Sequence, residues 1–346
     1  MEGVVTPSFW KDRSVFVTGH TGFKGAWLVM LLKHLGARVT GYALDPPTKP
    51  SLFQWAHVDE LVWDWRENIL DVPRLRAALQ RALPDIVIHM AAQSLVRPSY
   101  RDPLETYVTN VIGTANLLQA VESRPAHLIP RVALIVTTDK VYAHGQIMRP
   151  FREDDPLGGQ ADPYSTSKAC AEMVAAQFAR RLAGSCAVLT ARAGNVIGGG
   201  DFAEDRILPD AVRAFSRVEK LALRYPQAIR PWQHVLDPLC GYLTLCERSF
   251  DRAQDFLGAW NFGPGADHEC SVEELVQAFA RYWPGAQWHW QMELNPIETK
   301  ILRLDSSKAR ENLDWSCRLP LEQSLKWSAD FYQRMTHGVD VRTMIE

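Results

Sequence analysis

The chain has 346 residues, a formal net charge of -2 and 47% hydrophobic residues, which is the composition of an ordinary globular protein. The near-neutral charge gives no reason to expect nucleic acid or an anionic membrane as a partner, although a local basic site could still bind a small anion. The six cysteines form no CxxC pair, so we expect free thiols in a reducing, cytoplasmic compartment and no metal site. There is no stretch of about 18 apolar residues, and the N-terminus contains acid and proline, so neither a membrane-spanning helix nor a signal peptide is predicted.

Short apolar runs rich in β-branched residues alternate with helical patterns through the first half of the chain. Strands are predicted at Ser14–Thr18, Arg38–Leu44, Asp85–His89, Val132–Thr138 and Cys186–Ala191, and helices at Gly22–Leu35, Val72–Leu83, Leu104–Val121 and Ser165–Leu182. Near-continuous apolar strands that alternate with helices are typical of a parallel sheet covered on both faces. The sequence therefore predicts an α/β protein with a doubly wound parallel Rossmann sheet.

The pattern changes after Arg192. Residues Gly194–Asp201 are rich in glycine, which suits a loop where the backbone approaches a ligand, and Trp260–Gly263 is typical of a strand that returns to the sheet. We therefore expect a Rossmann domain over residues 1–190, with a returning segment at about 234–263. Residues 191–233 and 264–346 are predicted to form a smaller, partly discontinuous α/β domain that binds the substrate.

A glycine-rich turn, TGHTGFKG, follows the first predicted strand and opens the first predicted helix. Glycines in such a turn allow a tight bend and let backbone N–H groups at the helix N-terminus approach a pyrophosphate. The spacing is GxxGxxG rather than GxGxxG, so a simple strand–helix turn is the alternative interpretation. The residues predicted to bind a dinucleotide here are Gly19, Thr21, Gly22, Phe23 and Gly25.

Two further segments support a dinucleotide site. Asp45 follows Gly25 by about 20 residues, at the end of the second strand, where an acid accepts hydrogen bonds from the adenosine ribose. An acid there repels a 2′-phosphate, so it favours NAD over NADP, although an Asp before proline is also common in turns. The predicted strand Asp85–His89 leads into His89–Gln93, in which Ala91 and Ala92 leave room for a flat ring and Gln93 follows them. Tight packing alone would also explain those small residues.

Tyr164 and Lys168 form a YxxxK pair at the start of a long predicted helix. A spacing of four residues places both side chains on one helix face. Tyrosine has a pKa near 10 and is a weak base at neutral pH, but a neighbouring cation stabilises the phenolate and makes proton abstraction from a hydroxyl feasible. The pair is therefore a candidate catalytic site, and a chance pair of helix residues is the alternative.

Taken together, these motifs resemble the extended short-chain dehydrogenase/reductases. The longer stretches FWKDRSVFVTGHTGFKG, GYALDPPTKPSLF, DPYSTSKACAE, RAGNVIGGGDFAEDRILPD and RPWQHVLDPL resemble the CDP-glucose 4,6-dehydratase family, and the likeness covers nearly the whole chain. The resemblance implies NAD as cofactor and a nucleotide sugar as substrate. Many relatives carry Asp where this chain has Asn68, next to Ile69; we expect both residues at the adenine, because an amide oxygen can still accept from its amino group.

The resemblance implies a closed redox cycle and a role for each residue at the end of the predicted strand Val132–Thr138. Tyr164 would take the C4 hydroxyl proton while hydride moves to NAD, with Thr138 bonded to the same oxygen. Protonated Asp139 would donate to the departing C6 hydroxyl, and hydride would return to C6. Lys140 stands where most sugar-nucleotide dehydratases carry Glu, and it could be either the base at C5 or a cation that stabilises the enolate. The lysine of the YxxxK pair, Lys168, completes the predicted catalytic set.

Basic and amide side chains of the second half are candidates for the substrate diphosphate. Asn195, Arg206 and Arg230 are predicted to bind it, Arg192 is a further possible donor, and Glu298 resembles the family's ribose-binding acid. Lys24 could approach a phosphate, but an exposed lysine in the first helical turn is the expectation. The family also implies a homodimer through the helices at 104–121 and 165–182, which carry more apolar positions than one buried face requires.

Three alternative functions stay open from the sequence. A sugar-nucleotide 4-epimerase would use Tyr164 and NAD in the same way but would not need Asp139 or Lys140. A 4,6-dehydratase of a GDP- or dTDP-sugar would share the whole mechanism. A non-catalytic NAD-binding protein is disfavoured because the YxxxK pair and Thr138 are all present.

Overall fold

A computed structural model describes residues 5–143, 149–159, 162–265, 268–291, 302–336, 339 and 341–342 of the chain. Its centre is a sheet of seven strands in the order β11-β6-β5-β4-β1-β2-β3, and every pairing in it is parallel. The strands are β1 (Ser14–Thr18), β2 (Arg38–Ala43), β3 (Trp63–Arg66), β4 (Ile86–His89), β5 (Val132–Val136), β6 (Ala187–Ala193) and β11 (Gly258–Phe262). The predicted doubly wound parallel sheet is confirmed.

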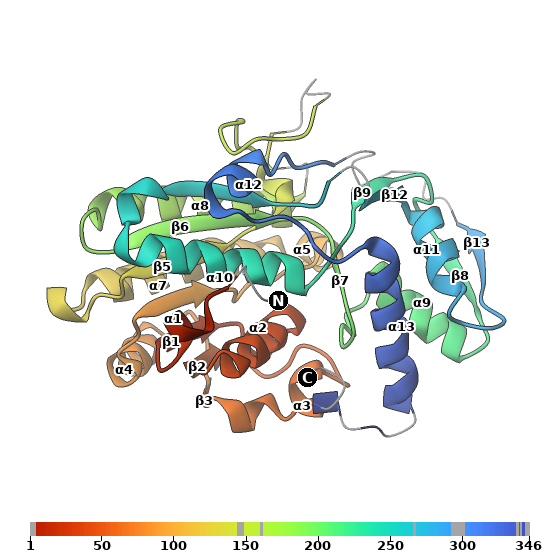
Figure 1. Ribbon diagram of the computed structural model, residues 1–346, viewed down its shortest axis with the longest axis horizontal. Helices are drawn as coiled ribbons and strands as arrows, with labels where there is room; N and C mark the ends of the chain where they lie inside the picture. The colour runs from red at the N-terminus through yellow and green to blue at the C-terminus, as the bar shows by residue number, and fades with distance from the viewer. Residues whose placement is uncertain are drawn as a thin grey trace.

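Helices cover both faces of the sheet (Figure 1). One face packs against α2 (Phe23–His34), α10 (Leu236–Asp251) and α12 (Ser307–Leu313), and the other against α4 (Val72–Ala82), α7 (Gly113–Glu122) and α8 (Pro163–Arg181). Because both faces are covered, central strands such as β1 and β5 are buried at every position, which explains their unbroken apolar sequence. The strand order reverses at β1, which pairs with β2 on one side and β4 on the other, and ligands bind beside such a switch point.

The edge strand β3 is not among the strands that the apolar runs predict. Its sequence, WDWR, alternates tryptophan with charged residues, and none of its positions is fully buried. An edge strand is covered on fewer sides than a central strand, so it does not need a continuous apolar run. Its charged residues bear on the ligand site described below.

A second, smaller core lies beside the sheet, at the right of Figure 1. It is built from α9 (Ile207–Ser216), β8 (Lys220–Leu223), β9 (Ile229–Pro231), β12 (Glu269–Ser271), α11 (Val272–Ala280), β13 (Gln287–Trp290) and α13 (Leu321–Thr336). Buried apolar side chains from α9, β8, α11 and α13 fill this core. We keep the predicted division into a Rossmann domain and a substrate domain as a proposal.

The remaining elements are short. They are α1 (Pro7–Trp10), α3 (Leu52–Trp55), η1 (Val58–Leu61), α5 (Val96–Arg101), α6 (Pro103–Tyr107), η2 (Val108–Ile112), η3 (Ala126–Leu128), η4 (Asp139–Val141), β7 (Val196–Ile197), β10 (Gln233–His234) and η5 (Ala253–Asp255). The predicted helix 104–121 is interrupted, because η2 is a π-helical segment between α6 and α7. Such segments are frequent at functional sites, and a hydrophobic period cannot reveal them.

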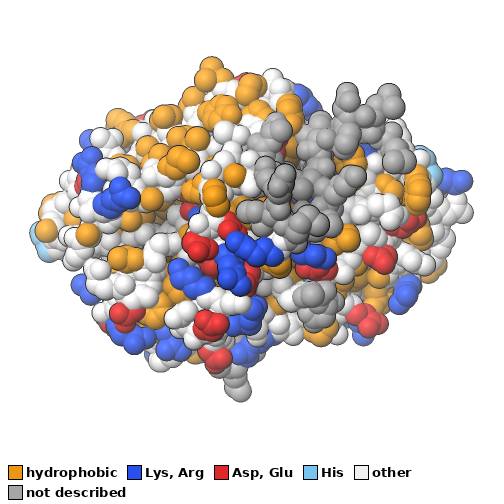
Figure 2. Space-filling model, turned by 90° about the horizontal axis from the view of Figure 1, so that it is seen from above, with side chains coloured by type: hydrophobic (Ala, Val, Ile, Leu, Met, Phe, Trp, Pro, Cys, Tyr) orange, Lys and Arg blue, Asp and Glu red, His pale blue; other side chains and the backbone are white. Residues whose placement is uncertain are grey.

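The surface has no large patch of one charge on the face drawn in Figure 2, where Lys and Arg side chains lie among Asp and Glu side chains. None of the helices in the described part of the chain is both long and apolar enough to cross a membrane. Within the same residues there is also no group of three or more His, Cys, Asp or Glu side chains that could hold a metal ion.

Candidate active site

The turn between β1 and α2 is shaped by its glycines. Gly19 has a φ of +75°, and a Cβ atom there would lie 2.6 Å from the backbone nitrogen of Ala91. A Cβ on Gly25 would lie 2.1 Å from the carbonyl oxygen of Gly19, so only glycine lets the helix approach the turn this closely. Gly22 is the N-cap of α2, and no side chain caps the helix there. The N–H groups of the first turn are therefore available to an anion such as a pyrophosphate.

The end of β4 is held against this turn by a hydroxyl. Thr18 Oγ1 accepts hydrogen bonds from the backbone nitrogens of Met90 and Ala91, each at 3.1 Å, and lies 2.7 Å from His89 Nδ1. Burial lowers the pKa of His89 to about 3, so this histidine is neutral. The small residues Ala91 and Ala92 consequently have a fixed position in the wall of the site.

Asp45 and Asn68 lie at the outer end of the site, beyond β2 and β3. The Asp45 side chain is 89% exposed and accepts a hydrogen bond from Arg66 Nη1 at 2.9 Å. Asn68 Oδ1 accepts from the backbone nitrogen of Leu70 at 2.9 Å, which leaves one lone pair of this oxygen for an adenine amino group. Ile69 is buried beside Asn68.

The YxxxK pair opens α8, which is capped by the Asp162 carboxylate and continued by Pro163 at its first position. Burial raises the pKa of Tyr164 to about 12, while a hydrogen bond with Thr138 and the positive charge of Arg206 act to lower it. Lys168 Nζ donates to the carbonyl oxygen of Val136 at 3.1 Å, and burial lowers the pKa of this amine to about 8. The protein alone therefore leaves the phenol protonated, and a bound ligand must supply further positive charge before it can act as a base.

Asn110, in the π-helical segment, fixes this part of α8 and was not found from the sequence. Its Nδ2 donates to Ser167 Oγ at 2.8 Å and to the carbonyl oxygen of Gln93 at 2.9 Å, and its Oδ1 accepts from the backbone nitrogen of Gln93. Ser167 Oγ in turn donates to the carbonyl oxygen of Tyr164 at 2.7 Å. The network ties the end of β4 to the first turn of α8 through η2.

Thr138, Asp139 and Lys140 follow β5 at the edge where ligands of parallel sheets bind. Thr138 Oγ1 donates to Asp139 Oδ1 at 3.0 Å, whereas Asp139 Oδ2 is buried and has no hydrogen-bond partner among the described residues. Burial raises the pKa of Asp139, although Lys140, Thr138 and Arg230 all act to lower it. A buried carboxyl with one bare oxygen and a raised pKa is suited to donate a proton to a ligand.

The predicted substrate residues come from the second half of the chain. Arg206 Nε lies 3.7 Å from Asp201 Oδ2, and Arg230 is a buried side chain in β9 whose Nη1 donates to the carbonyl oxygen of Ile229. Asn195 lies in the loop between β6 and β7. Glu298 lies outside the described residues.

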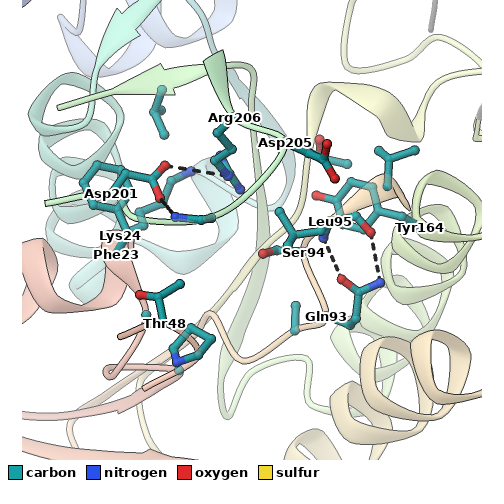
Figure 3. A pocket seen from close by; sticks show the side chains of 18 of the residues that line it. Phe23, Lys24, Thr48, Gln93, Ser94, Leu95, Tyr164, Asp201, Asp205 and Arg206 are labelled. Carbon is teal, nitrogen blue, oxygen red and sulfur yellow. Dashed lines mark hydrogen bonds and ion pairs between the residues drawn. The ribbon is translucent and has the colours of Figure 1, made fainter. Parts of the chain in front are cut away.

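The structure corrects two expectations about basic residues. Lys24 is not an exposed lysine: it is partly buried and points into the cleft near Asp201 and Arg206 (Figure 3). Burial, together with the charges of Arg206 and Lys168, lowers the pKa of Lys24 to about 7. Arg192 does not face the substrate site, because its guanidinium is buried in a salt bridge with Glu172, with Nε at 2.9 Å from Oε1.

One cleft of about 800 Å³ collects the predicted site residues that the structure describes. In Figure 3, Lys24 and Arg206 lie on one side of this cleft and Tyr164 and Gln93 on the other. Its lining includes Gly19, Thr21, Gly22, Phe23, Gly25, Asp45, Asn68, Ile69, Ala91, Ala92, Gln93, Thr138, Asp139, Lys140, Tyr164, Lys168, Asn195, Arg206 and Arg230. The uncapped helix end, the small residues beside it and the acid beyond β2 fit the pyrophosphate, a flat ring and the ribose of a dinucleotide.

Comparisons with known proteins identify the class. The model of the NAD dependent epimerase/dehydratase family matches residues 15–257, so the chain belongs to this family. The chain is also 41% identical to the CDP-glucose 4,6-dehydratase of Salmonella typhimurium, over 98% of this chain and 95% of that protein. It is 26% identical to the UDP-glucose 4-epimerase of Erwinia amylovora, over 90% of this chain and 96% of that protein.

Solved structures share the fold. The UDP-glucose-4-epimerase of Stenotrophomonas maltophila, with bound NAD and formylated UDP-arabinopyranose, matches with a TM-score of 0.82 at 20% identity, over 94% of this chain and 100% of that one. The dTDP-glucose 4,6-dehydratase of Bacillus anthracis in complex with NAD matches with a TM-score of 0.77 at 20% identity, over 94% of this chain and 98% of that one.

Proposed function

We propose that this protein catalyses the NAD-dependent 4,6-dehydration of CDP-glucose to CDP-4-keto-6-deoxyglucose. The observation that carries the proposal is the position of Asp139, a buried carboxyl with a bare oxygen in the same cleft as the YxxxK pair. An epimerase needs no acid for C6, whereas a dehydratase must protonate the departing hydroxyl. The identity of 41% with a CDP-glucose 4,6-dehydratase over nearly the whole chain supports the same conclusion.

The chain's own groups would divide the proton transfers among them. Bound NAD would supply the hydride acceptor for C4 and the hydride donor for C6, and the positive charge of its ring would help to lower the pKa of Tyr164. Tyr164 takes the C4 hydroxyl proton, and Thr138, which shares a hydrogen bond with it, orients the same oxygen. Loss of the hydroxyl proton together with the hydride on C4 leaves a ketone at C4, which makes the C5 hydrogen acidic. Asp139, with its raised pKa, then donates its proton to the C6 oxygen that leaves as water.

Lys140 has two roles that an experiment can separate. As a base, it would itself remove the C5 proton and pass it to solvent; as a cation, it would stabilise the enolate while another group removes this proton. A Lys140→Met variant that still exchanges the C5 hydrogen in deuterated water would assign the removal of this proton to another group. A variant without exchange, but with intact oxidation at C4, would show that Lys140 is required to form the enolate.

Mass spectrometry of the product tests the proposed function. Purified protein is incubated separately with CDP-glucose, dTDP-glucose, UDP-glucose and GDP-mannose, with catalytic NAD and no reductant. We expect one water to be lost from CDP-glucose, together with a 4-keto chromophore in alkali. A product of unchanged mass would favour the epimerase, and dehydration of a GDP- or dTDP-sugar would change the substrate.

We also propose a homodimer formed by the helices beside the YxxxK pair. Leu104, Ile112 and Met173 are 71%, 49% and 55% exposed, and they come from α6, η2 and α8, which pack against one another. Exposed apolar side chains that gather on neighbouring helices are typical of an interface between copies. Light scattering should give the mass of a dimer for the natural protein and of a monomer for an Ile112→Arg, Met173→Arg variant.

A cytoplasmic location is part of the same proposal. All six cysteines are free thiols, and burial raises the pKa of Cys186 to about 12, so this thiol stays protonated at neutral pH. A reducing compartment keeps such thiols reduced. Fractionation of the source cells, followed by detection of the protein in the soluble fraction, tests this location.

A further inference from the structure

A continuous chain of polar contacts runs from the glycine-rich turn to Asp45. His20 Nε2 lies 2.8 Å from Asp64 Oδ1, and Arg66 Nε donates to both carboxylate oxygens of Asp64 at 2.8 Å. The other end of the guanidinium, Nη1, donates to Asp45 Oδ1 at 2.9 Å. The turn that faces the pyrophosphate site is thus joined, through the end of β3, to the acid expected at the adenosine ribose.

The inner part of this chain is held firmly. The His20 ring is fully buried, and it fits only because Gly41 has no side chain: a Cβ there would lie 2.4 Å from the ring. The Arg66 guanidinium lies 4.5 Å from the centre of the Phe53 ring, and its side chain is only 30% exposed. With Asp64 on one edge and Phe53 on one face, the orientation of Arg66 does not depend on Asp45.

Asp45 contributes little to holding this arrangement. Its side chain is 89% exposed, and ion pairs with a partner so exposed add little to stability. The acid nevertheless occupies the outward Nη1 of Arg66, beside the cleft that Asp45 lines. Asp45 therefore has a second effect besides its own negative charge, because it prevents the oriented Arg66 guanidinium from binding another anion.

We propose that Arg66 is a preformed binding group for a ribose 2′-phosphate, kept from that role by Asp45. This inference rests on the proposed function, because it assumes that the cleft binds a dinucleotide with its ribose at Asp45. The negative charge of Asp45 repels a 2′-phosphate, and Asp45 already accepts the hydrogen bond that Arg66 Nη1 could otherwise donate to it. When Asp45 is replaced by an uncharged residue, the Arg66 guanidinium keeps its orientation and can bind the phosphate oxygens. An arginine beside the ribose is the usual way in which proteins bind NADP.

Calorimetric titration with NAD and NADP tests the proposal on protein freed of any copurified dinucleotide. The natural protein should bind NAD and discriminate against NADP. Asp45→Ser should lower the Kd for NADP by about 10- to 100-fold, the range expected for one charge-assisted hydrogen bond, while binding to NAD weakens. In Asp45→Ser, Arg66→Gln the gain for NADP should disappear, and Asp45→Ser, Arg66→Lys should retain only part of it, because lysine lacks the planar fork.

Arg81→Gln is the matched control, since Arg81 stacks on Trp63 in β3, the strand that also holds Arg66, and makes no hydrogen bond or ion pair with Asp45 among the described residues. This variant should leave the ratio of the two Kd values unchanged. The inference is overturned if Asp45→Ser does not lower the Kd for NADP. It is also overturned if Asp45→Ser, Arg66→Gln lowers this Kd by as much as Asp45→Ser alone. If the natural protein binds neither dinucleotide, the proposed function fails instead.

Two measurements separate this effect from misfolding. The thermal unfolding of Asp45→Ser should be unchanged, and Asp45→Asn, which keeps the shape of the side chain, should lower the Kd for NADP by the same factor.

Discussion

Two clusters of ionisable side chains lie at the carboxyl ends of β5 and β6, and they differ in how completely the protein satisfies them. In the buried cluster, Glu172 accepts hydrogen bonds from Thr137 at 2.5 Å and Thr190 at 2.6 Å, and two more from Arg192. In the cleft, Asp139 Oδ2 has no hydrogen-bond partner in the part of the chain that the structure describes. Burial shifts the pKa values of the cleft groups toward their neutral forms.

The difference separates a structural role from a chemical one. A buried charge whose partners are all supplied by the protein holds its surroundings in one arrangement. A buried polar group with an unused bonding position is unfavourable until a ligand supplies the partner, and such groups gather at sites of chemistry. Changes in the buried cluster should therefore affect stability first, and changes in the cleft should affect turnover first.

Glu172→Gln should have the largest effect, and the effect should be on stability. Removing this charge leaves the buried guanidinium of Arg192 without its counter-ion, which we expect to lower the free energy of unfolding by about 3–5 kcal/mol. Urea denaturation followed by circular dichroism measures it. The same substitution in the exposed pair of Glu122 with Arg181 should lower it by no more than about 1 kcal/mol. Equal losses at the two sites would remove the distinction between the clusters.

Tyr164→Phe should lower turnover without lowering stability, the opposite of what is expected for Glu172→Gln. Loss of the proposed base should lower kcat by about 10³-fold, within the range for general acid–base groups, while the free energy of unfolding stays the same or rises. The 4-keto chromophore formed from CDP-glucose reports the rate, and Tyr100→Phe is the control because Tyr100 is exposed. A variant with undiminished turnover would refute the catalytic assignment of Tyr164.

Asp139→Asn should lower turnover by about 10²-fold, because the amide cannot protonate the departing hydroxyl. Oxidation at C4 should persist, so reduced dinucleotide should accumulate and absorb in the near ultraviolet. The folded-state pKa of Asp139 lies above its ordinary value of 3.8, so the folded protein keeps a proton that the unfolded chain releases. Its contribution to stability therefore falls as pH rises above about 4, and the variant should lack this part of the pH dependence.

Lys24→Met should change stability by an amount that depends on pH. The pKa of Lys24 is lowered from 10.5 to about 7, so between these values the folded protein binds fewer protons than the unfolded chain. The lysine therefore contributes stability that rises with pH across this window and is lost as pH falls through 7. In protein without dinucleotide, the variant should be more stable than the natural protein near neutral pH, and the difference should shrink toward pH 10. Lys326→Met, at an exposed position, is the control.

The sequence predicted the elements whose burial forces a pattern. The fully buried strands β1 and β5 followed from their apolar runs, because both faces of the sheet are covered, and the helices α2 and α4 between them were predicted as well. The glycine-rich turn and the YxxxK pair were found because each is local, with its spacing fixed by one turn or one helix face. The edge strand β3 and the π-helical segment η2 carry no such pattern and were not found.

The sequence by itself thus determined the parallel α/β sheet, the family and the local motifs of the cleft, since all of these depend on residues close together in the chain. Only the tertiary structure decided which basic residues face a ligand. In the folded protein Arg192 pairs with buried Glu172, Lys24 lines the cleft, and Arg66 pairs with Asp45. The partner of a charged side chain and its exposure are set by segments distant in sequence, and these contacts, rather than residue type, fix its pKa and its role.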